Sequence, residues 1–223
     1  HVTGVQTCAL PIFTPVERKP EPRERIFASE LGGAMIDRFL KMKGVEYSTP
    51  PNMRSLRKFQ AGNYWEWIVS MVLKRAGLII SQQDRLEYAY DGLLPVSGKI
   101  DFLAGGTPDW GKARAEMDVY DMPEFVKNVT NGIINNFEAS GLKDFKKIVL
   151  EIKSCSSFVF RKIEAEEAPL KNHVLQCYHY IKGLNLDEGH IVYIDKDSVL
   201  LKEFCVYNPS ADRKSTRLNS SHV

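Results

Sequence analysis

An apolar run that ends in two charged residues, Lys147–Ser154 (KIVLEIKS), constrains the fold of this chain more than any other stretch. Side chains of a β-strand point alternately to two faces, so its even-numbered apolar residues share one face. Val149, Glu151 and Lys153 share the other face. The run predicts a buried strand that carries an acid and a base near its end. On its own, such a pair is also typical of a solvated edge strand.

The two ends of the chain are related at the level of DNA. Codons for residues 212–223 can be chosen so that their reverse complement encodes residues 1–12 at every position. The match stops there, because no codon for Phe13 is the reverse complement of a codon for Ala211. The two ends resemble a translated sequencing adapter. We therefore predict that residues 1–12 and 212–223 are artefactual tails, and we leave them out of the reasoning about the fold.

Removing the tails changes what the composition implies. The remainder carries 27 basic and 27 acidic residues, against 30 and 28 in the full sequence, so its net charge gives no support for nucleic-acid binding. Any basic surface must be local. Three cysteines remain without a Cys-x2-Cys pair, which is typical of reduced intracellular thiols rather than of a disulfide framework or a zinc site. No apolar run approaches the ~18 residues that span a bilayer, so no membrane partner is expected.

The remainder predicts one domain of ordinary size. Residues 13–27, rich in proline and charge, are expected to form a flexible lead-in, and residues 28–211 a single domain that is cut at one or both ends. Apolar periodicity and stop signals predict helices at 29–43, 52–58, 62–76, 125–139, 157–167 (short or irregular) and 170–182. Alternation predicts strands at 78–90, 93–104, 144–154, 190–195 and 199–207, with a polar loop at 105–123. This order predicts an α/β fold with a mixed central sheet flanked by helices.

A second carboxylate lies in the strand predicted at 93–104. Asp101 stands between apolar neighbours, and alone it would more often be a turn partner than a ligand. Two carboxylates that converge in a buried site repel, so Asp101 and Glu151 would persist together only with a cation between them. Oxygen ligands suit Mg²⁺ or Mn²⁺. Lys153 would lie beside that ion, where it could orient or deprotonate a water nucleophile and offset developing negative charge.

The helix predicted at 170–182 carries polar residues at helical spacing. His173, Gln176 and Tyr180 are three and four residues apart and therefore share one face. The alternative is a polar surface stripe on an amphipathic helix.

Taken together, Asp101, Glu151-x-Lys153 and Gln176-x3-Tyr180 resemble the motifs of the PD-(D/E)XK nuclease superfamily. The Gln-x3-Tyr element resembles the RecB-like exonuclease branch. The resemblance covers nearly the whole chain between the tails, and it implies a restriction-endonuclease-like core. The step from Asp101 to Glu151 is long for this family and requires an inserted loop and helix.

The resemblance also implies a role for each matching residue. Asp101 and Glu151 would bind the metal with the backbone carbonyl of Ile152, and Lys153 would be the catalytic lysine. Glu66 matches the polar residue of the first motif, where many members have histidine, and it would join the metal shell or bond Lys153. Some members hold an iron–sulfur cluster. Three scattered cysteines cannot supply four thiolates, so no cluster is expected.

The DNA contacts expected from the resemblance and from the basic residues lie on two helices. Gln176 and Tyr180 would line the DNA path and steady the site. The basic residues before Glu66 would touch phosphates. The complete set of expected DNA contacts is Gln176, Tyr180, His173, Arg54, Arg57 and Lys58.

These expectations converge on a metal-dependent DNA nuclease, with exonuclease favoured over endonuclease and a 5′-phosphate product. The resemblance implies DNA as partner, a setting in recombination, repair or phage DNA metabolism with recombination or replication proteins, and the cytoplasm of a bacterial or phage-infected cell. One alternative is a catalytically silent nuclease fold kept for DNA binding or assembly. Another is an unrelated hydrolase that uses Asp101 and Glu151 as general acid and base.

Overall fold

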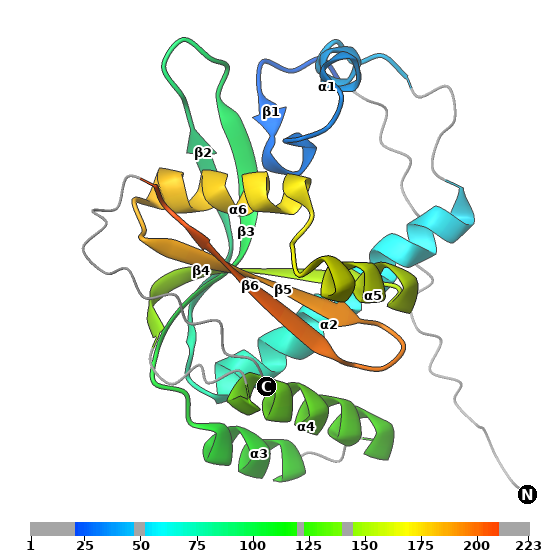
Figure 1. Ribbon diagram of the computed structural model, residues 1–223, viewed down its shortest axis with the longest axis vertical. Helices are drawn as coiled ribbons and strands as arrows, with labels where there is room; N and C mark the ends of the chain where they lie inside the picture. The colour runs from blue at the N-terminus through cyan, green and yellow to red at the C-terminus, as the bar shows by residue number, and fades with distance from the viewer. Residues whose placement is uncertain (1–20, 47–51, 120–122, 140–144, 210–223) are drawn as a thin grey trace, which may run out of the picture.

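The computed structural model describes residues 21–46, 52–119, 123–139 and 145–209, and its centre is a six-stranded sheet (Figure 1). The strands are β1 (Ile26–Phe27), β2 (Ile79–Tyr88), β3 (Val96–Gly106), β4 (Phe145–Cys155), β5 (Glu188–Asp195) and β6 (Leu201–Tyr207). Their order is β1-β3-β4-β5-β6, with β2 also paired to β3. The β1–β3 and β4–β5 pairs are parallel and the others antiparallel, so the sheet is mixed.

Helices cover both faces of the sheet. They are η1 (Ala28–Glu30), α1 (Met35–Met42), α2 (Met53–Arg75), α3 (Trp110–Val119), α4 (Glu124–Ala139), α5 (Ser157–Glu166) and α6 (Lys171–Leu184). The parallel strands β4 and β5 need a crossover connection, and α5 and α6 supply it. The predicted α/β fold with a mixed central sheet flanked by helices is confirmed.

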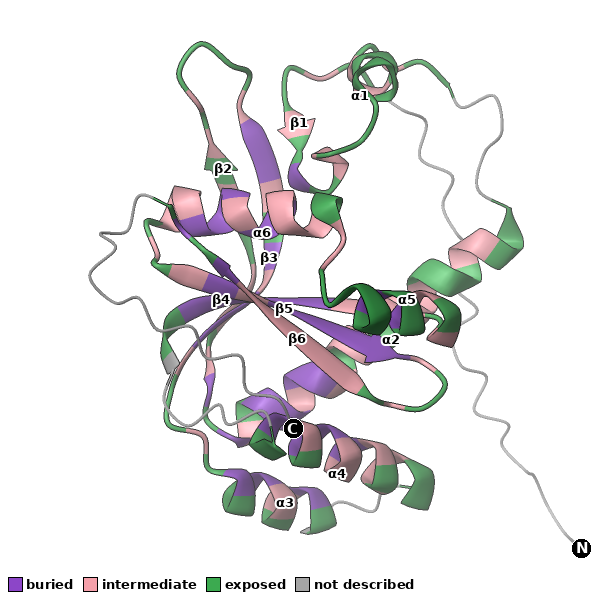
Figure 2. Cartoon of the chain, in the orientation of Figure 1, coloured by how far each residue is buried: buried purple, intermediate pink, exposed green. Residues whose placement is uncertain are grey.

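The two faces of β4 pack into two separate hydrophobic clusters, and the buried strands run through the middle of the molecule (Figure 2). Leu150 and Ile152 belong to the cluster beneath α2, α3 and α4. Val149 belongs to the cluster beneath α5 and α6. This division confirms the alternation predicted for the strand. It also places Glu151 and Lys153 on the face that α6 covers.

Over two stretches of the chain, 52–76 and 105–123, the structure has more helix than the sequence predicts. The helices expected at 52–58 and 62–76 form one helix, α2, which Asn52 caps by accepting a 2.9 Å hydrogen bond from the Ser55 N–H. A glycine inside a helix costs only about 1 kcal/mol, so Gly62 does not interrupt it. The loop expected at 105–123 contains α3. The Asp109 side chain caps the start of this helix, because its Oδ1 accepts a 2.8 Å hydrogen bond from the Lys112 N–H.

The N-terminal part of the described chain is more ordered than the sequence suggested. Residues 26–27, at the end of the predicted lead-in, pair with β3 as strand β1. The helix expected at 29–43 is divided into η1 and α1 by a turn in which Gly32 has φ +84°, a conformation that favours glycine. Within the described ranges, no helix is both long enough and apolar enough to cross a membrane.

Candidate active site

Asp101 lies where the pairing between β3 and β4 stops. The last paired residues on this side are Phe102 and Leu150. At the next position along the two strands, the Asp101 carboxylate takes the place of a backbone acceptor. Its Oδ2 accepts a 2.9 Å hydrogen bond from the backbone N–H of Ile152. A side chain thus replaces a backbone acceptor, and this holds the carboxylate between the two strands.

Glu151 follows on β4 and is completely buried. Its Oε1 accepts hydrogen bonds from Lys153 Nζ at 2.5 Å and from Gln176 Nε2 at 2.7 Å. Its Oε2 is buried and has no hydrogen-bond partner among the residues that the structure describes. A buried carboxylate oxygen without a donor is costly unless something else satisfies it.

The carboxyl groups of the site hold their protons more tightly than they would in water. Burial raises the pKa of Glu151 to about 8, with a further contribution from the charge of Asp101. Burial also raises the pKa of Asp101, and Lys153 and the Ile152 N–H offset this only in part. Glu66 follows the same pattern, because burial and the charge of Asp101 raise its pKa. The site therefore has more buried negative charge than its lysines balance.

Lys153 is the cation nearest to this charge. Burial opposes its charged form, but the carboxylates of Glu151, Asp101 and Glu66 outweigh that effect, so the pKa of Lys153 is raised above its ordinary value. The side chain is therefore an ammonium at neutral pH. In this state it can donate hydrogen bonds and stabilise negative charge, but it cannot accept a proton.

Glu66 reaches the site from α2 and is held by a residue that sequence reasoning missed. Gln83 on β2 donates a hydrogen bond from its Nε2 to Glu66 Oε1, and its own Oε1 lies 3.5 Å from Lys99 Nζ. Gln83 has φ +59°, in the left-handed region that a non-glycine residue adopts at a cost. No sequence signal marks such a position. Lys99 was recognisable only as the residue two before Asp101 on the same strand face.

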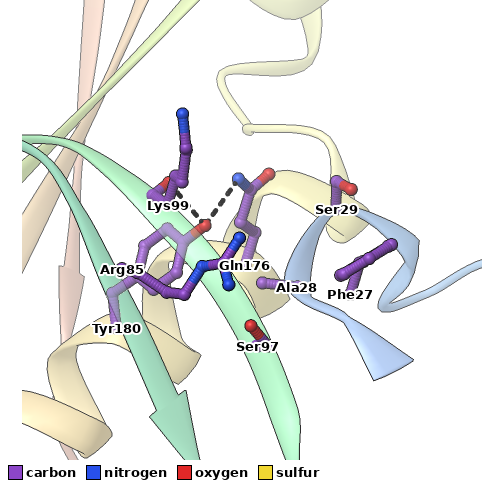
Figure 3. Close-up of a pocket in the computed structure, with 9 residues that line it drawn as sticks. Phe27, Ala28, Ser29, Arg85, Ser97, Lys99, Gln176 and Tyr180 are labelled. Atoms are coloured by element: carbon purple, nitrogen blue, oxygen red, sulfur yellow. Dashed lines mark hydrogen bonds between the residues drawn. The ribbon is translucent and has the colours of Figure 1, made fainter. Parts of the chain in front are cut away.

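Gln176 and Tyr180 connect Glu151 to β3. The Gln176 amide donates to Glu151. It also donates to the Tyr180 hydroxyl at 3.2 Å, and that hydroxyl donates to the backbone carbonyl of Lys99 at 2.9 Å (Figure 3). Both side chains are buried. The polar face of α6 therefore packs against the sheet, and the alternative of a solvated surface stripe is wrong. The Gln-x3-Tyr spacing places both groups on one helix face, where they fix the carboxylate.

His173 lies apart from this network. Its Nδ1 is 2.7 Å from the hydroxyl of Tyr193, and burial together with the charge of Lys153 lowers its pKa to about 4. The ring is therefore neutral at physiological pH, so it brings no positive charge to a phosphate.

The basic residues expected to touch DNA are not brought to the carboxylates. Arg54, Arg57 and Lys58 are exposed on the first turns of α2. At 1.5 Å per residue they lie about 12–18 Å along the helix axis from Glu66. They can contribute only to a more distant part of a bound polymer.

A cavity of about 310 Å³ opens beside Gln176 and Tyr180 (Figure 3). Residues of β1, η1, β2, β3 and α6 line it. Two of them, Arg85 and Lys99, are basic and exposed, and they were not among the expected site residues. The cavity therefore places positive charge next to the buried acidic centre.

Gly98 allows Tyr180 to approach β3 closely. A Cβ atom at this position would lie 2.5 Å from the Tyr180 hydroxyl and 2.8 Å from Cβ of Ala28. We expect Gly98→Ala to displace Tyr180 and to lower the thermal unfolding midpoint by several degrees, since overpacking costs about 1–3 kcal/mol. Gly132→Ala is the matched control.

At Gly132, in α4, the nearest atom to an added Cβ is 3.9 Å away. We expect that control to raise the unfolding midpoint slightly, because alanine favours a helix by about 1 kcal/mol over glycine. Equal midpoints for Gly98→Ala and the unmodified protein would show that Tyr180 does not depend on this close approach.

The donor set of the site fits a hard divalent cation. Three carboxyl groups with raised pKa, one of them with a buried oxygen that lacks a donor within the described ranges, would be satisfied by Mg²⁺ or Mn²⁺. The structure connects Ile152 to the site through its N–H. Its carbonyl as a ligand stays a prediction.

Comparisons with known proteins give similarities of fold. No family model matches the sequence, and no curated protein sequence matches it at a significant level. Among solved structures, SSO0001 is similar with 15% identity over 85% of this chain and 69% of that chain, at a TM-score of 0.43. The alkaline exonuclease LHK-Exo from Laribacter hongkongensis has 11% identity over 83% and 78% of the two chains, at a TM-score of 0.46. Its complex with dAMP gives 11% identity over 82% and 77%, at a TM-score of 0.47.

Similarity at this level adds nothing to the chemistry, which rests on the side chains of the site. The fold and the site together define an α/β domain whose sheet carries a buried cluster of carboxyl groups with a lysine.

Proposed function

We propose that this chain is a metal-dependent deoxyribonuclease. The observation that carries the proposal is the buried Glu151 carboxyl, which shares one oxygen between Lys153 and Gln176 and leaves the other without a donor among the described residues. Asp101 and Glu151 are the proposed metal ligands, together with the Ile152 carbonyl, and Glu66 is a further candidate. When bound, Mg²⁺ or Mn²⁺ would supply Lewis-acid activation of water and of the phosphate.

The side chains of the protein have separate tasks in this proposal. Lys153, as an ammonium, stabilises the negative charge that develops on the phosphate in the transition state. Gln176 and Tyr180 position Glu151, because their hydrogen bonds connect its carboxylate to the backbone of β3. Asp101 is fixed by the Ile152 N–H, so it needs little rearrangement to bind an ion. Pre-organised charges of this kind act most strongly in a buried site.

The proposed path of the DNA rests on the exposed basic residues. Arg85 and Lys99, at the cavity beside the acidic centre, are placed to bind a phosphate close to the scissile bond. Arg54, Arg57 and Lys58 are assigned to phosphates farther along the backbone. A single cavity with positive charge suits the end of a DNA strand better than the middle of one. This favours an exonuclease.

The test compares linear with covalently closed duplex DNA in the presence of Mg²⁺. We expect the protein to degrade only the linear form, and we expect Asp101→Asn to reduce the rate to background, because the amide does not replace an anionic ligand. Cleavage of both forms would make the protein an endonuclease. DNA binding without cleavage, with or without Mg²⁺, would instead favour a catalytically silent DNA-binding module.

A further inference from the structure

A second group of metal-binding side-chain types lies on β5 and β6, on the opposite face of the sheet from Glu151. In the parallel register His190 pairs with Leu150, whereas Glu151 pairs with Ile191. Leu150 packs beneath α2, α3 and α4, so His190 also points to that face. This second group is therefore separate from the candidate active site.

The antiparallel register of β5 and β6 brings these side chains together. His190 stands directly opposite Cys205, and Glu188 and Glu203 occupy neighbouring positions on the same face. One donor atom from each of Glu188, His190 and Cys205 lies within 4.8 Å of the others. All three residues are intermediate in exposure.

Two of the separations, which involve different oxygens of Glu188, are close to those of a tetrahedral metal centre. His190 Nε2 is 3.8 Å from Glu188 Oε1, and Cys205 Sγ is 3.6 Å from Glu188 Oε2. Bonds of 2.0–2.3 Å to nitrogen, oxygen and sulfur place the ligands of a tetrahedral zinc ion about 3.3–3.8 Å apart. To close the site around an ion, the Glu188 carboxylate must turn one oxygen toward both partners, and donor atoms that now lie within 4.8 Å of one another must draw together.

Glu203 contacts His190 but is not itself one of the three possible metal ligands. Its Oε1 lies 2.5 Å from Nδ1 of His190, on the side of the ring away from the Glu188 contact. A metal-binding histidine usually donates its second N–H to a carboxylate, which fixes the tautomer and orients the ring. With the proton on Nδ1, an ion would replace the present contacts of the other ring nitrogen, Nε2, which lies 3.8 Å from Glu188 Oε1.

We propose that Glu188, His190 and Cys205 bind Zn²⁺, with Glu203 as the residue that positions His190. A thiolate, an imidazole and a carboxylate suit zinc far better than Mg²⁺ or Ca²⁺, which prefer oxygen. The sequence did not predict this site, because its donors come from two strands and include no Cys-x2-Cys pair. Register, which the sequence does not give, brings them together.

The ion would connect the two strands at one edge of the sheet, β5 and β6. The strand β6 stands at the end of the strand order and pairs with β5. A zinc ion held by both strands would add a cross-link between them (Figure 1, orange and red strands). Zinc binding of this kind contributes directly to folding stability. It is also independent of the nuclease proposed above, so either can hold without the other.

Cobalt substitution tests the site on the whole chain. The chelator-treated protein is titrated with Co²⁺ as a spectroscopic substitute for Zn²⁺, and the thiolate-to-cobalt absorption band is recorded. We expect one equivalent of Co²⁺ to produce the band, Zn²⁺ to displace it, and Zn²⁺ to raise the thermal unfolding midpoint. Absence of a thiolate band in the unmodified protein would overturn the proposal, whatever the variants do.

Variants then assign the ligands. We expect Cys205→Ser to abolish the band, and Glu203→Gln to weaken Zn²⁺ binding by about 10–100-fold, as loss of an outer carboxylate usually does. Cys155→Ser is the control, and it should keep the band. A band that survives in Cys205→Ser but disappears in the control would place the metal elsewhere and refute the site. A proton on His190, held by the two carboxylates, is the alternative occupant, and it would leave the protein unable to take up either metal.

Discussion

Lys153→Ala is expected to lower the rate of Mg²⁺-dependent DNA hydrolysis by about 10²–10⁴-fold, the range produced by loss of a positioned charge or proton-transfer group. The Lys153 ammonium donates a hydrogen bond to Glu151 Oε1, and the charges of Asp101 and Glu66 also stabilise its charged form. Because it acts on charge that develops in the transition state, the loss should appear in kcat, with KM changed much less. Steady-state kinetics on linear duplex DNA measures both.

Lys147→Ala provides the matched control on the same strand. Lys147 is exposed near the start of β4, six residues from Lys153 and on the same side of the strand pleat. We expect its removal to leave kcat unchanged and to raise KM slightly at most. Circular dichroism of both variants separates a catalytic loss from unfolding. Retention of wild-type kcat by folded Lys153→Ala would remove the lysine from the mechanism.

The strand at Lys147–Ser154 shows how far the sequence can lead. Its alternation correctly assigned Leu150 and Glu151 to opposite faces. In a central strand, a shift of the pairing by one residue would turn every side chain to the wrong face, so the alternation fixes which face each residue takes. The positions of Asp101 and Gln176 beside Glu151 also followed the motif order. The resemblance also implied that Gln176 and Tyr180 steady the site. The packed structure adds how they do so, because both are buried against the sheet and Gln176 donates a hydrogen bond to the buried Glu151 carboxylate.

Other parts of the site depend on contacts between distant segments. Gln83, which donates a hydrogen bond to Glu66, has a left-handed backbone conformation that nothing in the local sequence indicates. Arg85 reaches the cavity because β2 pairs with β3 in a register that places it opposite Lys99. The helix α3 was missed for a different reason. Glycines and prolines around it suggested a loop, whereas the Asp109 side chain starts a helix within that range.

Glu151 should make the metal-free protein less stable as the pH rises. Its folded pKa of about 8 lies above the ordinary value of 4.5, so between these values the folded state retains a proton that the unfolded state has lost. The stabilisation is fully present below pH 4.5 and is lost as the pH rises through about 8, and its size is on the order of a few kcal/mol.

Glu151→Gln removes this titration, and the difference between the two proteins isolates it from every other group that titrates in the same range. We expect urea unfolding in the presence of a chelator to show that the wild type loses stability relative to Glu151→Gln between about pH 5 and 8. Mg²⁺ should reverse the trend for the wild type alone, because the ion binds the deprotonated carboxylate and its affinity rises as the proton leaves. A pH dependence that is identical in the two proteins, with and without Mg²⁺, would mean that Glu151 is charged throughout and binds no ion. The raised pKa and the buried oxygen would then require a different explanation from the metal centre on which the proposed nuclease depends.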